Sequence, residues 1–476
     1  MNNMKASILA MMMQGELIGN EENSAEYVCI DSRDSSEGKL FFPIIGEKVD
    51  AHKFIEDVFK SGCNITVCER SHYEKAKKEG FAWTKDKTVS IIVVDDTIKA
   101  LQKLAYEYIK KLDIIKVAVT GSVGKTTTRD MIRAGLSAKY QTKASMKNFN
   151  SDIGLPVAVL ALNDDDEACV LEMGMSAFGE IHELAKIVRP DIAVITNIGV
   201  SHIENLGSRD GIFRAKMEIT DFFTEKHTLV INADDDKLSQ INNSKYSLVK
   251  VGHDDKSDFV ISNIHENALS GVKFEIKRCN RNIKVNLDYP GTHNAVNAGL
   301  ALAVCEILGV DEKKAIRKIE SLELTSNRLS IQKINGINLI DDSYNAAPAS
   351  MISALKTLGS IESGRKIAIL AGMNELGDFE QTGHEKVGRT AFQEGIDTLI
   401  TIGEKAAMIE DGAKKAMLEI DEKHKKDSFK MCHFDTKEEL CAVLRTLIKN
   451  GDSVLIKGSR TFELEKVGDV IKREFS

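Results

Sequence analysis

The chain carries Gly121-Ser122-Val123-Gly124-Lys125-Thr126-Thr127 directly after an apolar, β-branched run at 114–120 and directly before a helical pattern. Glycines between a strand and a helix let backbone N–H groups approach phosphate oxygens at the helix N-terminus. In such a loop Lys125 can neutralise nucleotide phosphate oxygens, and the Thr126 hydroxyl can ligate Mg²⁺. An ordinary glycine turn is the alternative, because Val119 stands where the strict phosphate-loop pattern has its first glycine. The loop predicts a nucleoside triphosphate site on an α/β sheet.

Beyond this loop, strand-like runs alternate with amphipathic helical patterns. The runs nearest the loop are 117–120, 168–172, 192–198 and 228–232. Alternation of this kind predicts a largely parallel sheet with helices on both faces. A second set of runs lies at 366–371, 398–402 and 453–457. It predicts a smaller Rossmann-like domain, whose strand ends face a ligand.

The length of 476 residues exceeds what one hydrophobic core usually serves, so several domains are expected. We predict an α/β protein of three domains. Residues 1–112 form a smaller N-terminal α/β domain, and residues 113–325 form a central P-loop ATPase-like domain with a mostly parallel sheet. Residues 326–476 form a C-terminal Rossmann-like domain.

The composition argues against several classes of partner. A net charge of -8 without a long Lys/Arg block disfavours a nucleic-acid surface. The sequence has no run of about 18 apolar residues, and the run 6–13 is interpreted as a packed helix rather than a signal peptide. The 8 cysteines include no Cys-x-x-Cys pair, so neither a zinc site nor a disulfide framework is indicated. We expect a cytoplasmic protein, inserted in no membrane and bound to no nucleic acid.

Two polar side chains follow apolar runs close to the loop. Glu172 ends the run 168–172, where a nucleotidase commonly places a second Mg²⁺ contact; an exposed strand-end acid is the alternative. His202 follows the run 192–198 on the ligand side of such a sheet, although a lone histidine is more often structural. Because a guanine-binding Asn-Lys-x-Asp string is absent from the sequence, ATP is the expected nucleotide.

Further motifs, in their order and spacing, resemble those of the Mur ligases of peptidoglycan synthesis. Besides the loop 121–127, the motifs are Asp31-Ser32-Arg33, Lys147-Asn148, Glu172-Met173-Gly174, Ala215-Lys216, Gly291-Thr292-His293-Asn294, Asn327-Arg328, Asp341-Asp342-Ser343-Tyr344-Asn345, Glu375-Leu376-Gly377 and Lys457-Gly458-Ser459-Arg460. Each motif alone is weak, whereas the whole set is highly specific. The likeness covers nearly the whole chain.

The resemblance implies ATP-dependent formation of an amide bond. The carboxylate of a UDP-linked muramyl peptide attacks the γ-phosphate of ATP, and an amine then displaces phosphate from the acyl phosphate. Two Mg²⁺ ions are implied: Thr126 and Glu172 hold one, and His202 helps to hold the other. The resemblance also implies that Lys216 carries a CO₂-derived carbamate that ligates the second ion, although the bare sequence favours a surface lysine. The implied catalytic residues are Lys125, Glu172, His202 and Lys216.

Further binding residues are implied in the same way. Those for ATP are Gly121, Ser122, Val123, Gly124, Lys125, Thr126, Thr127, Asn294, Asn297, Arg328 and Asp342. Those for the UDP-linked substrate are Ser32, Arg33, Gly46, His52, Asn148, Tyr344 and Asn345. The acceptor is expected near 373–377 and 457–460, where cationic groups can meet its carboxylate.

Within the family, Tyr344-Asn345 and Glu375-Leu376-Gly377 favour the dipeptide-adding branch. Its substrates are UDP-N-acetylmuramoyl-tripeptide and D-alanyl-D-alanine, and we expect a monomer. The acceptor stays open, because Ala51 and Ala347 stand where the family usually has glycine and asparagine. The sequence also does not distinguish diaminopimelate from lysine as the third tripeptide residue. The alternatives are a sister ligase that adds one amino acid, a folylpolyglutamate synthetase, a P-loop ATPase switch and an inactive relative that only binds precursors.

Overall fold

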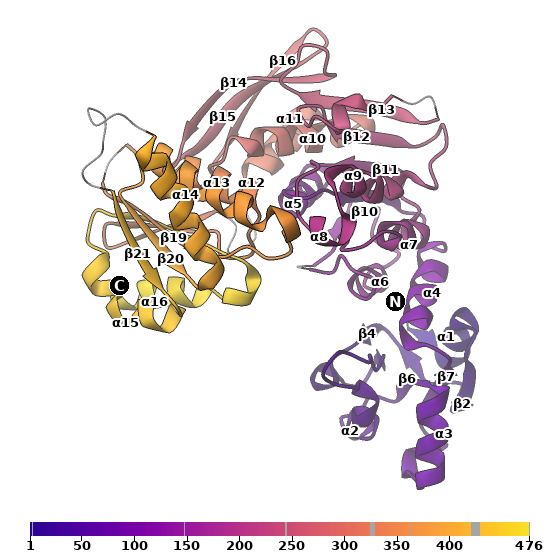
Figure 1. Cartoon of the computed structure of the whole chain (residues 1–476). Coiled ribbons are helices and arrows are strands. Elements are labelled where there is room, and N and C mark those ends of the chain that lie inside the picture. The colour runs from indigo at the N-terminus through magenta and orange to yellow at the C-terminus, as the bar shows by residue number, and fades with distance from the viewer. Residues whose placement is uncertain are drawn as a thin grey trace.

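The computed structural model describes residues 1, 3–146, 148–242, 245–323, 329–362, 364–419 and 429–475. Figure 1 shows the chain running from an indigo domain through a large magenta sheet to an orange and yellow domain. Each domain is built on its own β-sheet with helices packed against it. The α/β class and the three-domain architecture predicted from the sequence are therefore confirmed.

The N-terminal domain contains, among the described residues, a five-stranded sheet in the order β2-β7-β6-β5-β4. Its strands are β2 (Glu16–Gly19), β4 (Tyr27–Cys29), β5 (Lys39–Phe41), β6 (Ile65–Glu69) and β7 (Ser90–Val94), beside a small ribbon of β1 (Met4–Lys5) and β3 (Ser24–Ala25). Its helices are α1 (Ala6–Met13), α2 (Ile55–Lys60), α3 (Arg70–Glu79) and α4 (Thr97–Ile109). The run 6–13 thus forms a helix, and its apolar side chains pack into the domain core.

The central domain contains a sheet in the order β16-β15-β14-β13-β12-β11-β8-β10-β9. Its strands are β8 (Ile115–Thr120), β9 (Thr142–Ala144), β10 (Ala168–Glu172), β11 (Ile192–Ile195), β12 (Thr228–Asn232), β13 (Ser247–Gly252), β14 (Phe259–Asn267), β15 (Gly271–Arg278) and β16 (Arg281–Leu287). Its helices are α5 (Lys125–Leu136), α6 (Gly154–Leu160), α7 (Glu180–Val188), α8 (Ile203–Leu206), α9 (Arg209–Met217), α10 (His293–Ile307) and α11 (Glu312–Glu320). The strands from β9 to β14 are parallel, as predicted, whereas β14, β15 and β16 form an antiparallel extension that was not predicted.

The register of the central sheet brings the expected functional segments to one edge. Across β8 and β10, Val119 lies beside Glu172, and across β8 and β11, Thr120 lies beside Ile195. The carboxyl ends of these parallel strands therefore meet where α5 begins. Ligands bind at this edge in open α/β sheets.

The C-terminal domain contains a sheet in the order β17-β18-β22-β19-β20-β21. Its strands are β17 (Ser330–Ile334), β18 (Ile337–Asp341), β19 (Lys366–Ala371), β20 (Thr398–Ile402), β21 (Lys430–Phe434) and β22 (Ser453–Lys457). Its helices are α12 (Pro348–Gly359), α13 (Glu380–Gln393), α14 (Ala407–Leu418), α15 (Lys437–Leu447) and α16 (Glu465–Phe475). All neighbouring strands are parallel except β17 and β18, which matches the Rossmann-like pattern expected from the sequence.

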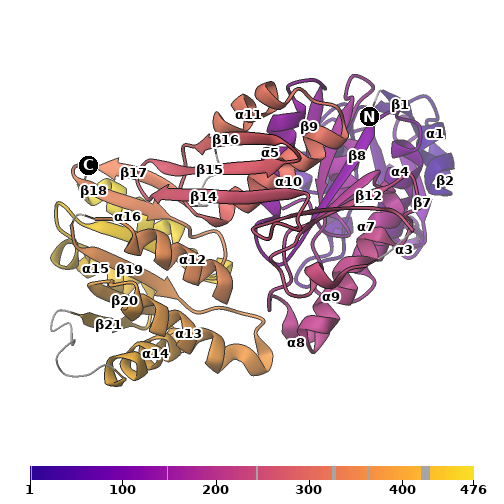
Figure 2. The same cartoon turned by 90° about the horizontal axis from the view of Figure 1, so that it is seen from above.

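The antiparallel extension of the central sheet reaches the C-terminal domain (Figure 2). Ala268, in the turn after β14, belongs to the same buried cluster as Leu329 and Leu358. Nearby, Thr357 Oγ1 donates a hydrogen bond of 3.2 Å to Glu266 Oε1. The extension therefore packs against the C-terminal domain and holds it next to the central domain.

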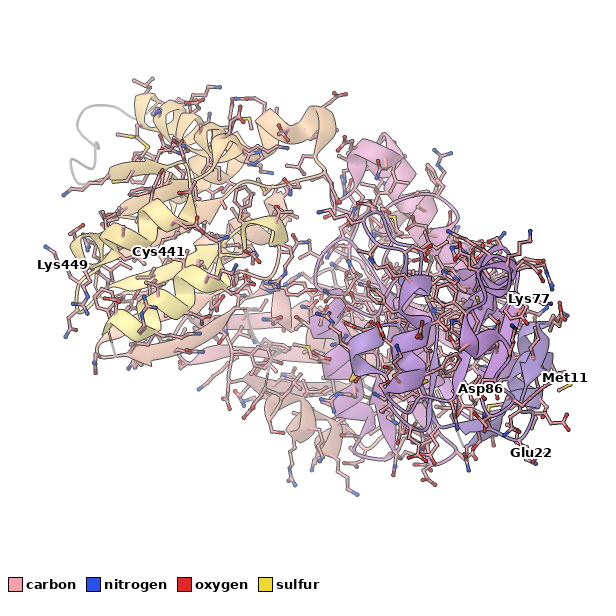
Figure 3. The ribbon with its side chains drawn as sticks, turned by 90° about the horizontal axis from the view of Figure 1, so that it is seen from below. Met11, Glu22, Lys77, Asp86, Cys441 and Lys449 are labelled. Carbon is pink, nitrogen blue, oxygen red and sulfur yellow. The ribbon has the colours of Figure 1, made fainter. Side chains whose placement is uncertain are left out.

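The two outer domains lie at opposite ends of the molecule. Seen from below, Lys77 and Asp86 of the N-terminal domain are far from Cys441 and Lys449 of the C-terminal domain (Figure 3). We propose to keep 1–112, 113–325 and 326–476 as the domain ranges, since the joints between the sheets fall between α4 and β8 and between α11 and β17. Within the described residues, the helices are all too short or too polar to cross a lipid bilayer.

Candidate active site

The glycine loop lies between β8 and α5, as its sequence predicts. Gly124 precedes the first turn of α5 with a φ of 83°, a left-handed conformation that glycine adopts without strain. A Cβ atom at Gly121 would lie 1.8 Å from Thr196 Oγ1, so a larger residue cannot occupy that position without moving the loop. Both glycines are therefore required by the path of the backbone.

The side chain of Asn197 fixes the conformation of this loop. Val123 N donates a 3.0 Å hydrogen bond to Asn197 Oδ1, and Asn197 Nδ2 donates one of 2.9 Å back to Val123 O. Thr196 Oγ1 also donates to Val123 O, at 2.6 Å. The sequence-based site did not include Asn197. Its position just after the strand that neighbours β8 was the available signal.

Glu172 ends β10 inside the protein, with 3% of its surface exposed. Thr126 Oγ1 donates a 2.8 Å hydrogen bond to its Oε2, and Asn150 Nδ2 donates one of 2.8 Å to its Oε1. Arg129 NH1 lies 3.6 Å from the same Oε2. The exposed strand-end acid considered above is thus wrong. A hydroxyl and a carboxylate, both oxygen ligands that Mg²⁺ prefers, are held together at the end of the loop.

Lys216, in the last turn of α9, is only 2% exposed, so the interpretation as a surface lysine is wrong. Burial, followed by the nearby charge of Lys125, lowers the pKa of the Lys216 amine well below its ordinary value. No carboxylate forms an ion pair with Lys216 anywhere in the described part of the chain. Lys125 Nζ itself donates a 2.8 Å hydrogen bond to Gly121 O.

His202 caps the start of α8 in a left-handed backbone conformation, with a φ of 63°. Its Nδ1 lies 2.6 Å from Oε2 of Glu375 in the C-terminal domain. The contact is short but not aligned as a hydrogen bond. The histidine beside it lowers the pKa of the Glu375 carboxyl below its usual range. The lone histidine of the sequence is therefore part of an interdomain contact.

Residues of the C-terminal domain face the glycine loop and Glu172 across a cavity between the two domains. Asp342 follows β18, and Lys457 Nζ at the end of β22 donates a 2.6 Å hydrogen bond to its Oδ2. Tyr344 Oη donates to Oδ1 of Asn148, which joins this side of the cavity to the central domain. Lys457, 2% exposed, and Arg460 both line the cavity, and both are paired with a carboxylate, Lys457 with Asp342 and Arg460 with Glu465 at 2.7 Å. Contact of this motif with an acceptor carboxylate stays a prediction.

The two asparagines expected near adenine lie in the first turns of α10 and are both buried. Asn297 Nδ2 donates a 3.1 Å hydrogen bond to Asn294 Oδ1, and Asn294 Nδ2 donates one of 2.7 Å to Pro290 O. A Cβ atom at Gly124 would lie 3.2 Å from Asn297 Oδ1, so Asn297 packs against the glycine loop. Arg328, the remaining nucleotide contact expected from the sequence, lies outside the described residues.

A cavity of about 810 Å³ lies between the central and C-terminal domains. The expected site residues that line it are Ser122, Val123, Gly124, Lys125, Thr126, Thr127, Asn148, Glu172, His202, Lys216, Asn294, Asn297, Asp342, Tyr344 and Asn345. Gly121 adjoins it at the base of the loop. One cavity therefore joins the glycine loop, Glu172, His202 and the motif that follows β18.

The four expected residues of the N-terminal domain lie away from this cavity. Arg33 is exposed and forms a 2.6 Å ion pair with Asp31, next to Ser32. Gly46 N donates a 2.9 Å hydrogen bond to Val49 O. His52, by contrast, is 7% exposed and belongs to a polar cluster. The structure does not bring these residues together with the phosphate loop.

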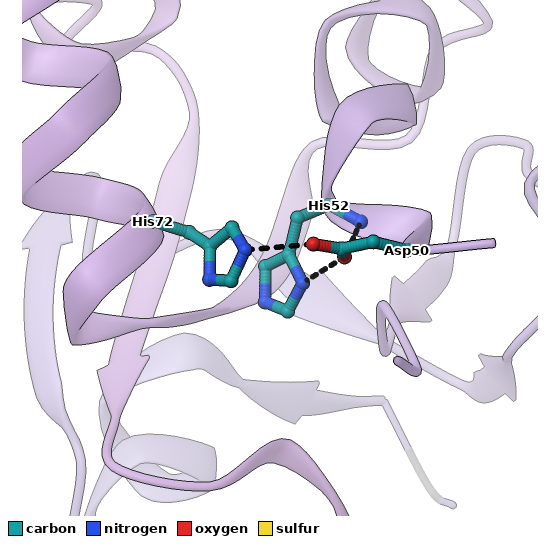
Figure 4. A group of neighbouring side chains, drawn as sticks. All are labelled: Asp50, His52 and His72. Atoms are coloured by element: carbon teal, nitrogen blue, oxygen red, sulfur yellow. Dashed lines mark hydrogen bonds and ion pairs between the residues drawn. The ribbon is translucent and has the colours of Figure 1, made fainter. Parts of the chain in front are cut away.

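Hydrogen bonds fix the His52 cluster (Figure 4). Its Nε2 accepts the Glu69 N–H at 3.1 Å, so Nδ1 carries the proton and donates it to Asp50 Oδ1 at 2.7 Å. His72 Nε2 lies 2.7 Å from Asp50 Oδ2, and the two rings stack with centroids 3.9 Å apart. The three potential ligand atoms lie within 4.8 Å of one another. A metal ion on His52 Nδ1 would displace a proton that Nε2 cannot accept, so hydrogen bonding explains this cluster better than metal binding.

We expect the N-terminal domain to lose stability as the pH falls below about 6.5, the ordinary pKa of histidine. Burial, with a smaller contribution from the charge of His72, lowers the pKa of His52 in the folded domain. The unfolded chain then binds a proton at His52 more readily than the folded domain does. The stability that the neutral His52 contributes is therefore fully present above pH about 6.5 and declines as the pH falls below it. Urea unfolding at pH about 7.5 and about 5.5, on either side of that value, would measure the change in the free energy of unfolding. The fluorescence of Trp83 reports on this domain, since it is the single tryptophan and is buried there.

The matched variants in this experiment are His52→Gln and His253→Gln. His52→Gln should reduce the difference between the two pH values, whereas His253→Gln, in the central domain, should leave the Trp83 transition unchanged. An unaltered pH dependence in His52→Gln would show that another group is responsible.

Comparisons with known proteins agree with this geometry. Three family models match consecutive parts of the chain: Mur ligase family, catalytic domain over residues 25–108; Mur ligase middle domain over 119–305; and Mur ligase, glutamate ligase domain over 327–460. The chain belongs to the Mur ligase family.

Individual relatives match over almost the full length. The chain is 35% identical to the UDP-N-acetylmuramoyl-tripeptide--D-alanyl-D-alanine ligase of Bacillus subtilis (strain 168), with 98% of each chain covered. Among solved structures, MurF from Acinetobacter baumannii superposes with a TM-score of 0.84 at 27% identity, covering 99% of both chains. MurF ligase from Thermotoga maritima in complex with ADP superposes with a TM-score of 0.79 at 27% identity, and the match covers 94% of this chain and 97% of that one.

Proposed function

We propose that this chain is an ATP-dependent, ADP-forming ligase that joins D-alanyl-D-alanine to UDP-N-acetylmuramoyl-tripeptide in the cytoplasm, during peptidoglycan synthesis. The observation that carries the proposal is the shared cavity, where the phosphate loop and Glu172 face Asp342 and Tyr344 of the other domain. The Bacillus subtilis relative named above bears this activity in its name and is 35% identical over 98% of this chain. We expect the protein to act as a monomer.

The chemistry proceeds in two steps. The terminal carboxylate of the tripeptide attacks the γ-phosphorus of ATP, which forms a carbon–oxygen–phosphorus linkage and releases ADP. The neutral amine of D-alanyl-D-alanine then attacks the acyl carbon and the carbon–nitrogen bond forms. The bond from that carbon to the phosphate oxygen breaks, inorganic phosphate leaves, and the nitrogen gives up one proton to solvent while keeping the other as the amide N–H. Lys125 lies beside the loop and offsets the negative charge that the carboxylate and the triphosphate bring together.

The residues present fit two Mg²⁺ ions. Thr126 and Glu172 offer a hydroxyl and a carboxylate oxygen 2.8 Å apart, and His202 contributes an imidazole on the same cavity. Arg129 partly balances the Glu172 charge. When bound, Mg²⁺ supplies positive charge that lets two anionic reactants approach.

We further propose that Lys216 is carbamylated by CO₂. The side chain is buried, pairs with no carboxylate among the described residues and lines the cavity together with Thr126, Glu172 and His202. A carbamate converts it into an anionic oxygen ligand for the second Mg²⁺ ion. Only an un-ionised amine reacts with CO₂, and the lowered pKa described above favours that form.

The remaining roles divide between the domains. We propose that Asn294, Asn297, Arg328 and Asp342 contact ATP together with the loop 121–127, and that Asn148, Tyr344 and Asn345 contact the peptide of the UDP-linked substrate. Ser32, Arg33, Gly46 and His52 of the N-terminal domain bind its uridine end. A substrate that extends from the N-terminal domain into the cavity explains why these four residues lie apart from the rest.

A substrate panel tests the proposal. Phosphate release should require both UDP-N-acetylmuramoyl-tripeptide and D-alanyl-D-alanine, and the tripeptide should be supplied with either diaminopimelate or lysine as its third residue. Turnover with a single amino acid as acceptor, together with no turnover with the dipeptide, would indicate a sister ligase. ATP hydrolysis without an acceptor would indicate an ATPase switch, and turnover with folate and glutamate would indicate a folylpolyglutamate synthetase.

A further inference from the structure

His202 and Glu375 meet across the cavity from different domains. His202 precedes α8 in the central domain, and Glu375 follows β19 in the C-terminal domain. Their nearest atoms, His202 Nδ1 and Glu375 Oε2, are 2.6 Å apart. Protein atoms enclose Nδ1, while the side chain as a whole keeps 30% of its surface exposed and lines the cavity. The other ring nitrogen, Nε2, is therefore the one available to a ligand.

Both residues of this contact have a backbone conformation that is unusual for side chains other than glycine. His202 has a φ of 63° and Glu375 a φ of 62°. Such conformations are strained for residues with a side chain, and they persist where the surrounding structure holds them, often at functional sites. The two backbones are thus held in the positions that bring the imidazole and the carboxylate together.

We propose that Glu375 is a positioning residue that orients the His202 ring as a metal ligand. A histidine that ligates a metal commonly donates its other ring N–H to a carboxylate, which fixes the tautomer and raises the basicity of the ligating nitrogen. In this proposal Nδ1 carries the proton, held by the Glu375 Oε2 atom that lies 2.6 Å away, and a small rotation of the ring or the carboxylate aligns the two as a hydrogen bond when the metal binds. Nε2 is then left without a proton and can ligate the metal. The inference rests on the proposed function, in which His202 holds Mg²⁺.

This arrangement has a consequence for how the site is completed. Glu375 belongs to the C-terminal domain, whereas the loop 121–127 and Glu172 belong to the central domain. His202 is therefore held in its ligating tautomer only while the C-terminal domain lies against the central one. Metal affinity becomes coupled to the position of the domain that also contacts the nucleotide.

The test uses Mn²⁺ as the probe, titrated in the presence of a non-hydrolysable ATP analogue and followed by the electron paramagnetic resonance of free Mn²⁺. Glu375→Ala should weaken Mn²⁺ binding by about 10- to 100-fold, the usual effect of losing such a carboxylate. Glu375→Gln keeps an oxygen that can accept the Nδ1 proton, so it should recover part of the loss. Asp378→Asn removes an exposed carboxylate three positions further along the same loop and should bind Mn²⁺ as the wild type does.

A second measurement reports the tautomer directly. In ¹⁵N-histidine-labelled protein, the signal of His202, assigned by its loss in His202→Gln, should show Nδ1 protonated in the wild type and move towards Nε2 protonation in Glu375→Ala. An unchanged Mn²⁺ affinity or an unchanged tautomer in Glu375→Ala would overturn the positioning role even if the wild type ligates the dipeptide. A wild type that neither binds Mn²⁺ with nucleotide nor forms product would overturn the proposed function as well.

Discussion

Lys216→Ala is expected to lower ligase turnover by about 10²-fold or more, because the variant cannot form the carbamate that we propose as a ligand of the second metal ion. Lys216 is 2% exposed and borders the cavity, so alanine leaves a space within reach of the solvent that fills the site. Acetate or propionate fits such a space and returns a carboxylate to the position of the carbamate oxygens. Added acid should therefore restore part of the activity.

The controls separate this explanation from simple loss of a lysine. Lys313→Ala removes an exposed lysine on α11 of the same domain and should neither lose activity nor respond to acetate. Phosphate release would be measured for both variants over a series of acetate concentrations at constant ionic strength. Full activity in Lys216→Ala, or a folded but inactive variant that no short acid restores, would contradict the carbamate.

The features that could be predicted from the sequence are those set by neighbouring residues. The sequence placed the loop 121–127 between a strand and a helix, and the structure confirms that position between β8 and α5; its glycines and Lys125 predict a phosphate site without knowledge of the rest of the fold. Glu172 was predicted as a Mg²⁺ contact in the same way. It ends a parallel strand, and the carboxyl ends of such strands meet at one edge of the sheet. The α/β class followed from the alternation of strands and helices.

The features that could not be predicted depend on contacts between distant segments. Lys216 has the local pattern of a surface helix, and only the packing of α9 beside α7 and α8 in the folded domain shows that its amine is buried. Asn197 acts on the loop through hydrogen bonds that span 74 positions of the chain. The pairing of Lys457 with Asp342 was not predicted, because nothing local shows that β22 lies beside β18 and brings Asp342 to it.

The pair of Lys457 and Asp342 leads to the second large effect, a loss of stability in Lys457→Met. Lys457 Nζ donates to Asp342 Oδ2 at 2.6 Å and to Asn345 O at 2.9 Å, and the two side chains are 2% and 13% exposed. Methionine fills a similar volume but leaves the carboxylate without its partner. Breaking a buried pair in this way costs about 3–5 kcal/mol of the free energy of unfolding. Urea unfolding followed by circular dichroism would measure the loss.

Two further variants distinguish the buried pair from a general effect of lost charge. Lys466→Met breaks an exposed pair with Glu463 in the same domain and should change the free energy of unfolding far less than Lys457→Met does, because solvent screens exposed charges. The double variant Lys457→Met, Asp342→Asn removes both charges and should lose less than the sum of the two single changes, because no uncompensated carboxylate remains. Asp342 Oδ1 also accepts the N–H of Leu329 at 3.2 Å, so the carboxylate holds the entry to the C-terminal domain as well.

The same set of variants, Lys457→Met, Asp342→Asn and the double variant, tests whether Lys457 affects nucleotide binding by holding Asp342. If Lys457 acts by holding Asp342 in place, Lys457→Met should weaken binding of an ATP analogue strongly in the wild-type background and only slightly in the Asp342→Asn background. Isothermal titration calorimetry measures both steps without turnover. Equal losses in the two backgrounds would mean that Lys457 acts independently of Asp342, through its contact with Asn345 O or with the nucleotide itself.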